Sequence, residues 1–136
     1  MTEIYHQIES AIIPLAVKQG VSFYHSWIFR YKATGEPFPL FTGDGVALWK
    51  GRCMIRENYD DVGYLISLTS EVGGLEMVFT AGSPAIATYG IILTAVQTAS
   101  LPRENCVYDI EFERLSDGWV IRPQSGPIVV EVEATK

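Results

Sequence analysis

The sequence has few of the residues from which most active sites are built. Its 136 residues include only two histidines and two cysteines. His6 and His25 lie in different segments, without the short spacing that places two metal ligands on one helix face. No serine has a nucleophile-elbow context, and no glycine-rich turn follows a strand and opens a helix. We therefore expect no catalytic, metal-binding or cofactor-binding residues, and no enzymatic activity.

A cationic stripe and a long apolar run are also missing. The net charge is −6 and the basic residues are scattered, with Arg52 and Arg56 the nearest pair. Such a surface does not neutralise a phosphate backbone, so we expect no nucleic-acid partner. No apolar run approaches the roughly 20 residues of a membrane span, and the first residues lack the pattern of a signal peptide. We expect no membrane partner and assembly in a cytoplasm.

The two cysteines, Cys53 and Cys106, each lie within a strand pattern. Buried free thiols are the expected state for a cytoplasmic protein. A disulfide between them would require their two strands to lie side by side.

The most informative stretch runs from residue 91 to residue 113. Ile91 and Leu93 alternate with smaller or outward positions, as in a half-buried strand. Thr94 and Gln97 then have the spacing of a helix capping box, and the proline at 102 ends the helix. An alternating strand pattern resumes over residues 108–113. This order predicts a crossing between the two sheets of a β-sandwich.

Other short strand patterns are separated by turn signals at residues 34–37, 44–45 and 117–118. We expect a loop at 123–127 and a last strand at 128–132. Gly51, within a strand pattern, indicates a bulge or close packing against another element. The predicted fold is an all-β, immunoglobulin-like antiparallel β-sandwich of about seven to nine strands with one short crossover helix. Its expected core comprises Phe23, Trp27, Phe29, Ile55, Leu68, Ile91, Leu93, Leu101, Tyr108, Ile110 and Phe112.

We divide the chain into residues 1–19, an N-terminal arm or first strand, and residues 20–136, the sandwich domain. Ile4, Ile8 and Ile12 have helical spacing, but the same region also suits an extended arm with Ile13 beginning a first strand. An arm of this kind is expected to dock on another subunit. The alternative is that it folds back as an edge strand of its own sandwich. Trp119, just after a hairpin turn, is either an exposed aromatic or partly buried against its own hairpin. The candidate interface residues are Ile4, Tyr5, Ile8, Ile12, Ile13 and Trp119.

The order of several segments resembles a known family. These segments are residues 20–23, Gly35-Glu36-Pro37, residues 53–56, 93–102 and 108–111, Asp117-Gly118, and residues 128–132. Together they resemble small tail-associated virion proteins of bacteriophages, related to the N-terminal immunoglobulin-like domain of phage baseplate upper proteins. The segment at 93–102 is the most specific of these.

The resemblance implies a structural component of a virion, in the tail, baseplate or neck, present in many symmetric copies. Its implied partners are other virion structural proteins, and its functional residues are interfaces. An alternative is a carbohydrate- or receptor-binding sandwich on a fibre. That function would require a row of exposed aromatic side chains, for which Trp119 with Trp49 is the candidate.

Overall fold

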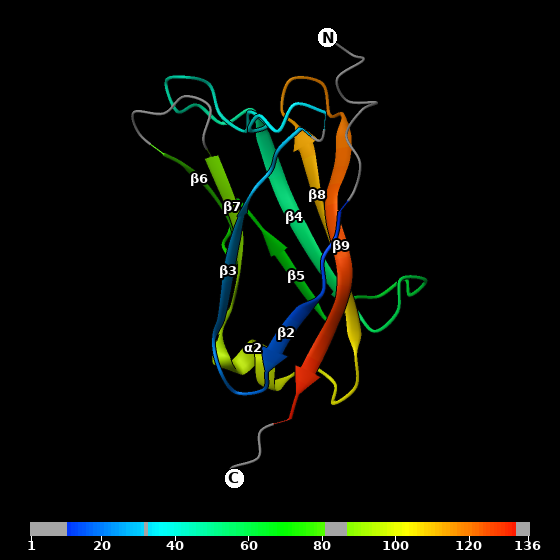
Figure 1. Ribbon diagram of the computed structural model, residues 1–136. Helices are drawn as coiled ribbons and strands as arrows, with labels where there is room; N and C mark the ends of the chain where they lie inside the picture. Colours follow the sequence, from blue (N-terminus) through cyan, green and yellow to red (C-terminus); the bar gives the residue numbers. More distant parts are fainter. Residues whose placement is uncertain (1–10, 32, 81–86, 133–136) are drawn as a thin grey trace.

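Two β-sheets pack face to face in this computed structural model, which describes residues 11–31, 33–80 and 87–132 (Figure 1). The predicted all-β, immunoglobulin-like sandwich is confirmed. The larger sheet has the strand order β1-β9-β8-β4-β5, with β2 also paired to β9, and the smaller sheet has the order β3-β7-β6. The strands are β1 (Ala11–Ile12), β2 (Leu15–Lys18), β3 (Phe23–Ile28), β4 (Trp49–Arg56), β5 (Ile66–Thr69), β6 (Leu75–Phe79), β7 (Ala87–Leu93), β8 (Cys106–Arg114) and β9 (Val120–Glu131).

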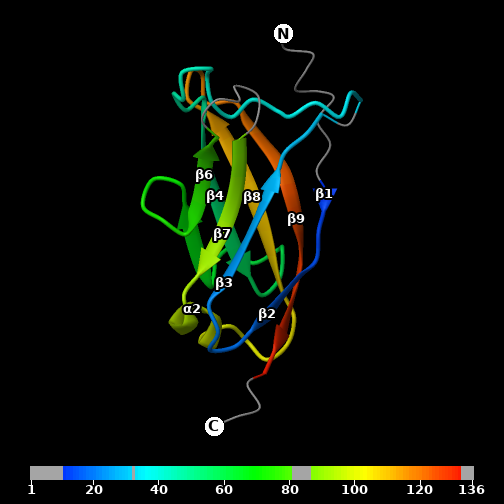
Figure 2. The same cartoon turned by 60° about the vertical axis from the view of Figure 1, so that its left-hand side comes forward.

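The core lies between the two sheets and follows the predicted alternation. Eight of the expected residues are buried, namely Ile55, Leu68, Ile91, Leu93, Leu101, Tyr108, Ile110 and Phe112. The other three, Phe23, Trp27 and Phe29, are only partly buried and pack against the edge of this cluster. Phe23 and Trp27 belong to β3 and Phe29 directly follows it, and β3 lies at an edge of the smaller sheet, which leaves these side chains less covered (Figure 2).

The crossing between the sheets is confirmed. Strand β7 belongs to the smaller sheet and β8 to the larger one, and helix α2 (Ala95–Ala99) connects them. The Thr94 hydroxyl accepts a hydrogen bond from the Gln97 backbone amide at 3.1 Å, and the Gln97 side chain accepts one from the Thr94 backbone amide at 2.9 Å, so the capping box is present.

Within the described residues, no helix is long and apolar enough to cross a membrane.

Gly51 allows the two sheets to approach closely. A Cβ atom at this position would lie 2.6 Å from Cδ2 of Leu75 on β6. Real Cβ contacts are much longer, so any larger residue would require Leu75 or its sheet to shift. Of the two explanations that we considered for this glycine, the structure therefore supports close packing.

The predicted loop at 123–127 is wrong, because these residues continue β9. A register shift lies between Ile110 and Phe112 of β8, where Pro123 falls outside the paired positions. Proline is tolerated at such a bulge because no ladder hydrogen bond is lost there. Pro127 lies between the part of β9 that pairs with β1 and the part that pairs with β2. Two prolines therefore resemble a loop in the sequence although the strand is continuous.

The chain from Ala11 to Lys18 forms edge strands parallel to β9. Ala11 and Ile12 are thus extended, and the helical pattern that we considered for this region is wrong for these two residues. The Ile13 carbonyl accepts the Tyr108 hydroxyl at 2.7 Å. It lies only 2.4 Å from where a Cβ of Gly126 would be, so the glycine makes room for this bend. Ile4, Tyr5 and Ile8 lie outside the described residues.

Both cysteines are free and buried, as expected. Their strands, β4 and β8, are neighbours, which is the condition that a disulfide would require. The register nevertheless pairs Cys53 with Ile110 and Arg56 with Val107. Cys106 is therefore offset from Cys53 by about four residues, or roughly 13 Å along the strands. Disulfides need Cα atoms within about 7 Å, so the two thiols cannot join in the folded state.

Candidate interaction surface

An aromatic-lined hollow lies at one end of the sandwich. It forms between the long connection from β3 to β4 and the turn from β8 to β9, at the top of Figure 1. The connection is folded rather than loose, because Phe38 donates its amide to the Phe29 carbonyl and Leu48 to the Leu40 carbonyl. The predicted turns are present, with Gly35 and Gly45 at φ of 74° and 84°. Phe38 and Leu40 anchor the connection in the core.

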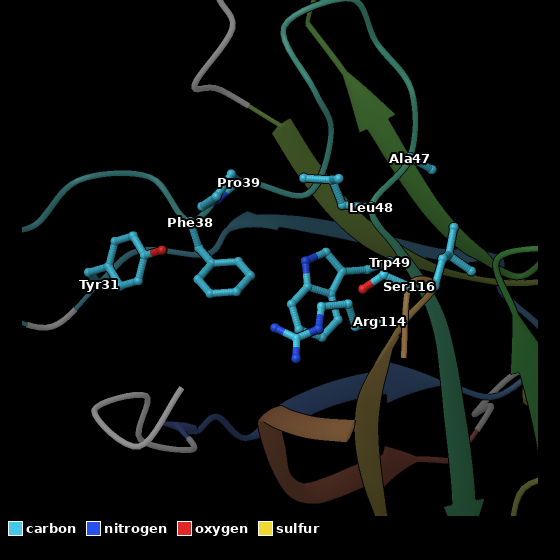
Figure 3. Close-up of a pocket in the computed structure, with 9 residues that line it drawn as sticks. Tyr31, Phe38, Pro39, Ala47, Leu48, Trp49, Arg114 and Ser116 are labelled. Carbon is cyan, nitrogen blue, oxygen red and sulfur yellow. The ribbon is translucent and has the colours of Figure 1, made fainter. Parts of the chain in front are cut away.

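The hollow encloses about 370 Å³ and has a largely apolar lining (Figure 3). Aromatic rings form its floor, with Phe38 5.2 Å from Tyr31 and 5.6 Å from Trp49 between ring centroids. Phe38 and Trp49 are only 2% and 3% exposed. They therefore form the base of the hollow and offer no open aromatic face. The complete lining is Tyr31, Phe38, Pro39, Ala47, Leu48, Trp49, Arg114, Leu115 and Ser116.

Arg114 is the one charged group in this lining. Its guanidinium lies 5.9 Å from the centre of the Trp49 ring. It also donates through Nε to Asp117 at 2.8 Å and makes a second bond through Nη2. These hydrogen bonds, together with the Trp119 amide, lower the pKa of Asp117 to about 2. The arginine charge is thus balanced by an ionised carboxylate at neutral pH, and the site does not select for an anionic ligand.

Exposed apolar side chains also occur at this end of the sandwich, and two of them, Leu48 and Leu115, line the hollow. They lie on both elements that form it, and a hydrogen bond of 3.0 Å from the Leu115 amide to the Leu48 carbonyl joins these elements. We define this set as the loop-end patch. It comprises Val46, Leu48, Leu115, Trp119 and Val120. Clusters of exposed apolar residues commonly mark sites of protein association.

The structure separates the interface residues that the sequence suggested. Trp119 is 40% exposed and belongs to the loop-end patch. Ile12 is 77% exposed, but it lies beside Ser125 in the middle of β9. Ile13 is partly buried and its main chain is bound to the sheet. Trp119 and Ile12 therefore do not form one surface.

Sequence reasoning missed most of the loop-end patch. Its members come from two turns that are far apart in the chain, and single exposed apolar residues in turns give no periodic signal. The alternation of Phe38 and Leu40 was a usable sign that this connection is anchored in the core. The intervening Pro39 and the turn signals on both sides made it resemble an ordinary loop.

Within the ranges described here, no group of three or more His, Cys, Asp or Glu residues could hold a metal ion. The loop-end patch offers apolar contact area, and the adjoining hollow contains one cation, Arg114, that is paired with Asp117. This arrangement is suited to binding another macromolecule.

Comparisons with known proteins give a distant likeness in fold. No protein-family model matches the chain. No curated protein matches either. Among solved structures, the chain is similar to the NK cell receptor NKp44, described as a triggering partner in natural cytotoxicity. The two are 14% identical with a TM-score of 0.44, over 90% of this chain and 100% of that one.

Proposed function

We propose that this protein is a structural component of a bacteriophage virion, in the tail, baseplate or neck, that acts through protein–protein interfaces. The observation that carries the proposal is the resemblance to phage tail-associated domains, which is strongest at residues 93–102. In the structure this segment includes the capped helix that connects the sheets. The proposed partners are other virion proteins, and several symmetric copies are expected in each particle.

The loop-end patch is the proposed contact surface. Burying apolar area contributes about 25 cal/mol per Å², so several exposed aliphatic side chains and one tryptophan could supply much of a contact's free energy. The Asp117 carboxylate holds the turn before Trp119 by accepting the Trp119 amide at 3.0 Å. A pre-organised turn loses less conformational entropy on binding than a mobile one.

The test is whether the chain is part of purified phage particles. Mass spectrometry of particles from the phage that encodes it should detect the chain at a stoichiometry of several copies. A Leu48→Glu/Leu115→Glu variant should fold normally but show greatly reduced incorporation. Val72→Glu is the matched control, because Val72 is also exposed but lies in the turn between β5 and β6. Absence of the chain from particles would contradict the virion role, and normal incorporation of the double variant would contradict the proposed surface.

A carbohydrate- or receptor-binding module on a fibre is the second candidate. Its support is the exposed Trp119 beside an aromatic-lined hollow. Burial of Phe38 and Trp49 weighs against it, because sugars stack on open aromatic faces. Binding on a glycan array that is lost in Trp119→Ala would favour this candidate over the first.

A further inference from the structure

Strand β3 is an open edge of the smaller sheet. It pairs with β7 on one side, and no other described strand pairs with it. Its sequence, Phe-Tyr-His-Ser-Trp-Ile, contains no lysine, arginine, aspartate, glutamate or proline over six residues. Regular edge strands without such residues are templates for pairing with another chain.

The other described edges have the features that prevent such pairing. Strand β5 is only four residues long, and Thr69 at its end is bridged to Gly74. Strand β6 has Glu76 on its exposed face. The edge formed by β1 and β2 is interrupted at Pro14 and has Lys18 at its end. Short strands, charges and prolines are common protections of natural edges, so β3 is the exception in this fold.

The side chains of β3 are also more exposed than their sequence suggests. Tyr24 on the outer face is 59% exposed. On the inner face, His25 is exposed, although its ring lies 4.8 Å from that of Trp27. Phe23 and Trp27 are only partly buried. These aromatic side chains face the core but remain partly exposed at the edge of the sheet. A second chain that paired with β3 could cover them.

We propose that β3 pairs with β3 of a second copy of this chain, antiparallel and about a two-fold axis through Ser26. In this register Ser26 lies opposite Ser26 of the second copy, Tyr24 opposite Ile28, and His25 opposite Trp27. Paired residues then share a face, so both sandwiches keep their cores on the same side of one continuous sheet. Every pair except the central serines includes an aromatic side chain, which is the kind of cross-strand pair that stabilises sheets.

A second copy fits this edge for two reasons. The strand contains no lysine, arginine, aspartate or glutamate that would repel its own copy, and the register above matches large side chains with large ones. Pairing also joins the three-stranded sheets of two copies into one sheet of six strands. The strand is only about 20 Å long, so the contact is smaller than the roughly 800 Å² per partner of a standard interface. The association should therefore be weak and concentration-dependent in isolation, and effective where many copies are held together.

Cysteine crosslinking of the purified full-length chain tests the register. Ser26→Cys should give a disulfide-linked dimer after mild oxidation, because opposite Cβ atoms lie about 5 Å apart. His25→Cys is the matched variant. In the proposed register the two residues at position 25 are offset by two residues, or roughly 8 Å, which is too far for a disulfide. Wild-type protein is the control for the native thiols, which are buried. Crosslinking of His25→Cys but not Ser26→Cys would overturn the register, and crosslinking of neither would overturn the dimer.

Sedimentation over a range of concentrations tests the edge without a crosslink. Ser26→Lys sets two ammonium groups opposite each other and should weaken the dimer about fivefold or more. Val78→Lys introduces the same charge on the exposed face of β6, at the opposite edge of the sheet, and should leave the dimer unchanged. A wild-type chain that stays monomeric at millimolar concentration, or equal weakening by both lysines, would overturn the proposal. These experiments use purified protein, so their outcome is independent of the virion role.

Discussion

The outer faces of the two sheets differ sharply in charge. On the larger sheet, the outward positions of the two central strands are mostly charged, namely Lys50, Arg52, Arg56, Asp109, Glu111 and Glu113. On the smaller sheet, the outward positions are Tyr24, Ser26, Ile28, Glu76, Val78, Thr88, Gly90 and Ile92, of which only Glu76 is charged. The charged outer face of the larger sheet is thus suited to exposure to solvent. The smaller sheet has the less charged outer face, and it includes the β3 edge for which we propose pairing with a second copy.

The charges of the larger sheet largely satisfy one another. Glu111 accepts hydrogen bonds from Arg52 at 2.9 Å and from Arg122 at 3.2 Å. Glu113 lies 3.3 Å from the Lys50 ammonium. Cross-strand pairs of opposite charge on neighbouring strands stabilise a sheet modestly. Most of the charged side chains of this face are therefore paired across neighbouring strands.

Between the sheets, one chain of buried hydrogen bonds couples the two halves. The Tyr89 hydroxyl, on the smaller sheet, donates to Oε1 of Gln124 at 2.7 Å. Nε2 of Gln124 donates to the Tyr108 hydroxyl at 2.8 Å, and that hydroxyl donates to the Ile13 carbonyl. Burial raises the pKa of Tyr108 to about 12, so this hydroxyl keeps its proton at physiological pH. The network fixes both the sheet-to-sheet register and the bend before β2.

The largest expected effect comes from the centre of the larger sheet. Phe112 is fully buried and packs edge-on against Tyr89 of the smaller sheet at 5.1 Å. Phe112→Ala should lower the free energy of unfolding by about 3–5 kcal/mol because it leaves a cavity. Phe23→Ala, at the open edge of the smaller sheet, should cost only about 1–2 kcal/mol. Urea denaturation of both variants measures the difference, and equal costs would mean that the β3 edge is as closed as the sandwich centre.

The next loss of stability is expected at Gly51, where the two sheets approach each other closely. Gly51→Ala forces a methyl group toward Leu75 and should destabilise the protein by about 1–3 kcal/mol. Gly63→Ala is the matched control, because a Cβ there meets nothing within 4 Å. Thermal unfolding monitored by circular dichroism should separate the two variants. A stable Gly51→Ala protein would show that the side chains facing Gly51, or the sheets themselves, can adjust without cost.

The sequence predicted the sheets well but not how they meet a partner. The sandwich was predictable from the alternation of apolar residues along β4, β7 and β8. The crossing between the sheets was predictable from the Thr94–Gln97 capping box, because both signals are local in sequence. The continuity of β9 was missed because two prolines outweighed the pairing available from both neighbours. The loop-end patch and the open β3 edge depend on which strands are neighbours in space. A single sequence does not contain that information in a periodic form.

The helix that joins the two sheets should be moderately sensitive. Thr94→Ala removes the acceptor of the Gln97 amide and should cost on the order of 1 kcal/mol. Leu101→Ala, just beyond the helix, should cost roughly 2–4 kcal/mol because Leu101 is fully enclosed. Denaturant titration of the two variants provides the comparison. Similar small losses at both positions would show that the crossover contributes little to the packing.

The smallest loss of stability is expected from a substitution on the charged outer face of the larger sheet. Burial alone would raise the pKa of Glu111, but the hydrogen bonds and charges of Arg52 and Arg122 outweigh it and hold that pKa below the usual 4.5. A carboxyl group with a lowered pKa in the folded state stabilises the protein above its unfolded pKa, and this contribution is lost as pH falls through the folded value.

Glu111→Gln should therefore cost no more than about 1 kcal/mol at pH 7 and low salt, and less at high salt. The difference from wild type should disappear as the pH falls through the lowered pKa of Glu111, because the carboxyl group is then protonated in the folded protein. Glu76→Gln is the control on the smaller sheet, because Glu76 is exposed and makes no ion pair within the described part of the chain, so its cost should not depend on salt. Urea titrations at two salt concentrations and several pH values provide the measurement. A loss at Glu111 that does not change with salt or pH would mean that its carboxylate contributes through packing rather than charge.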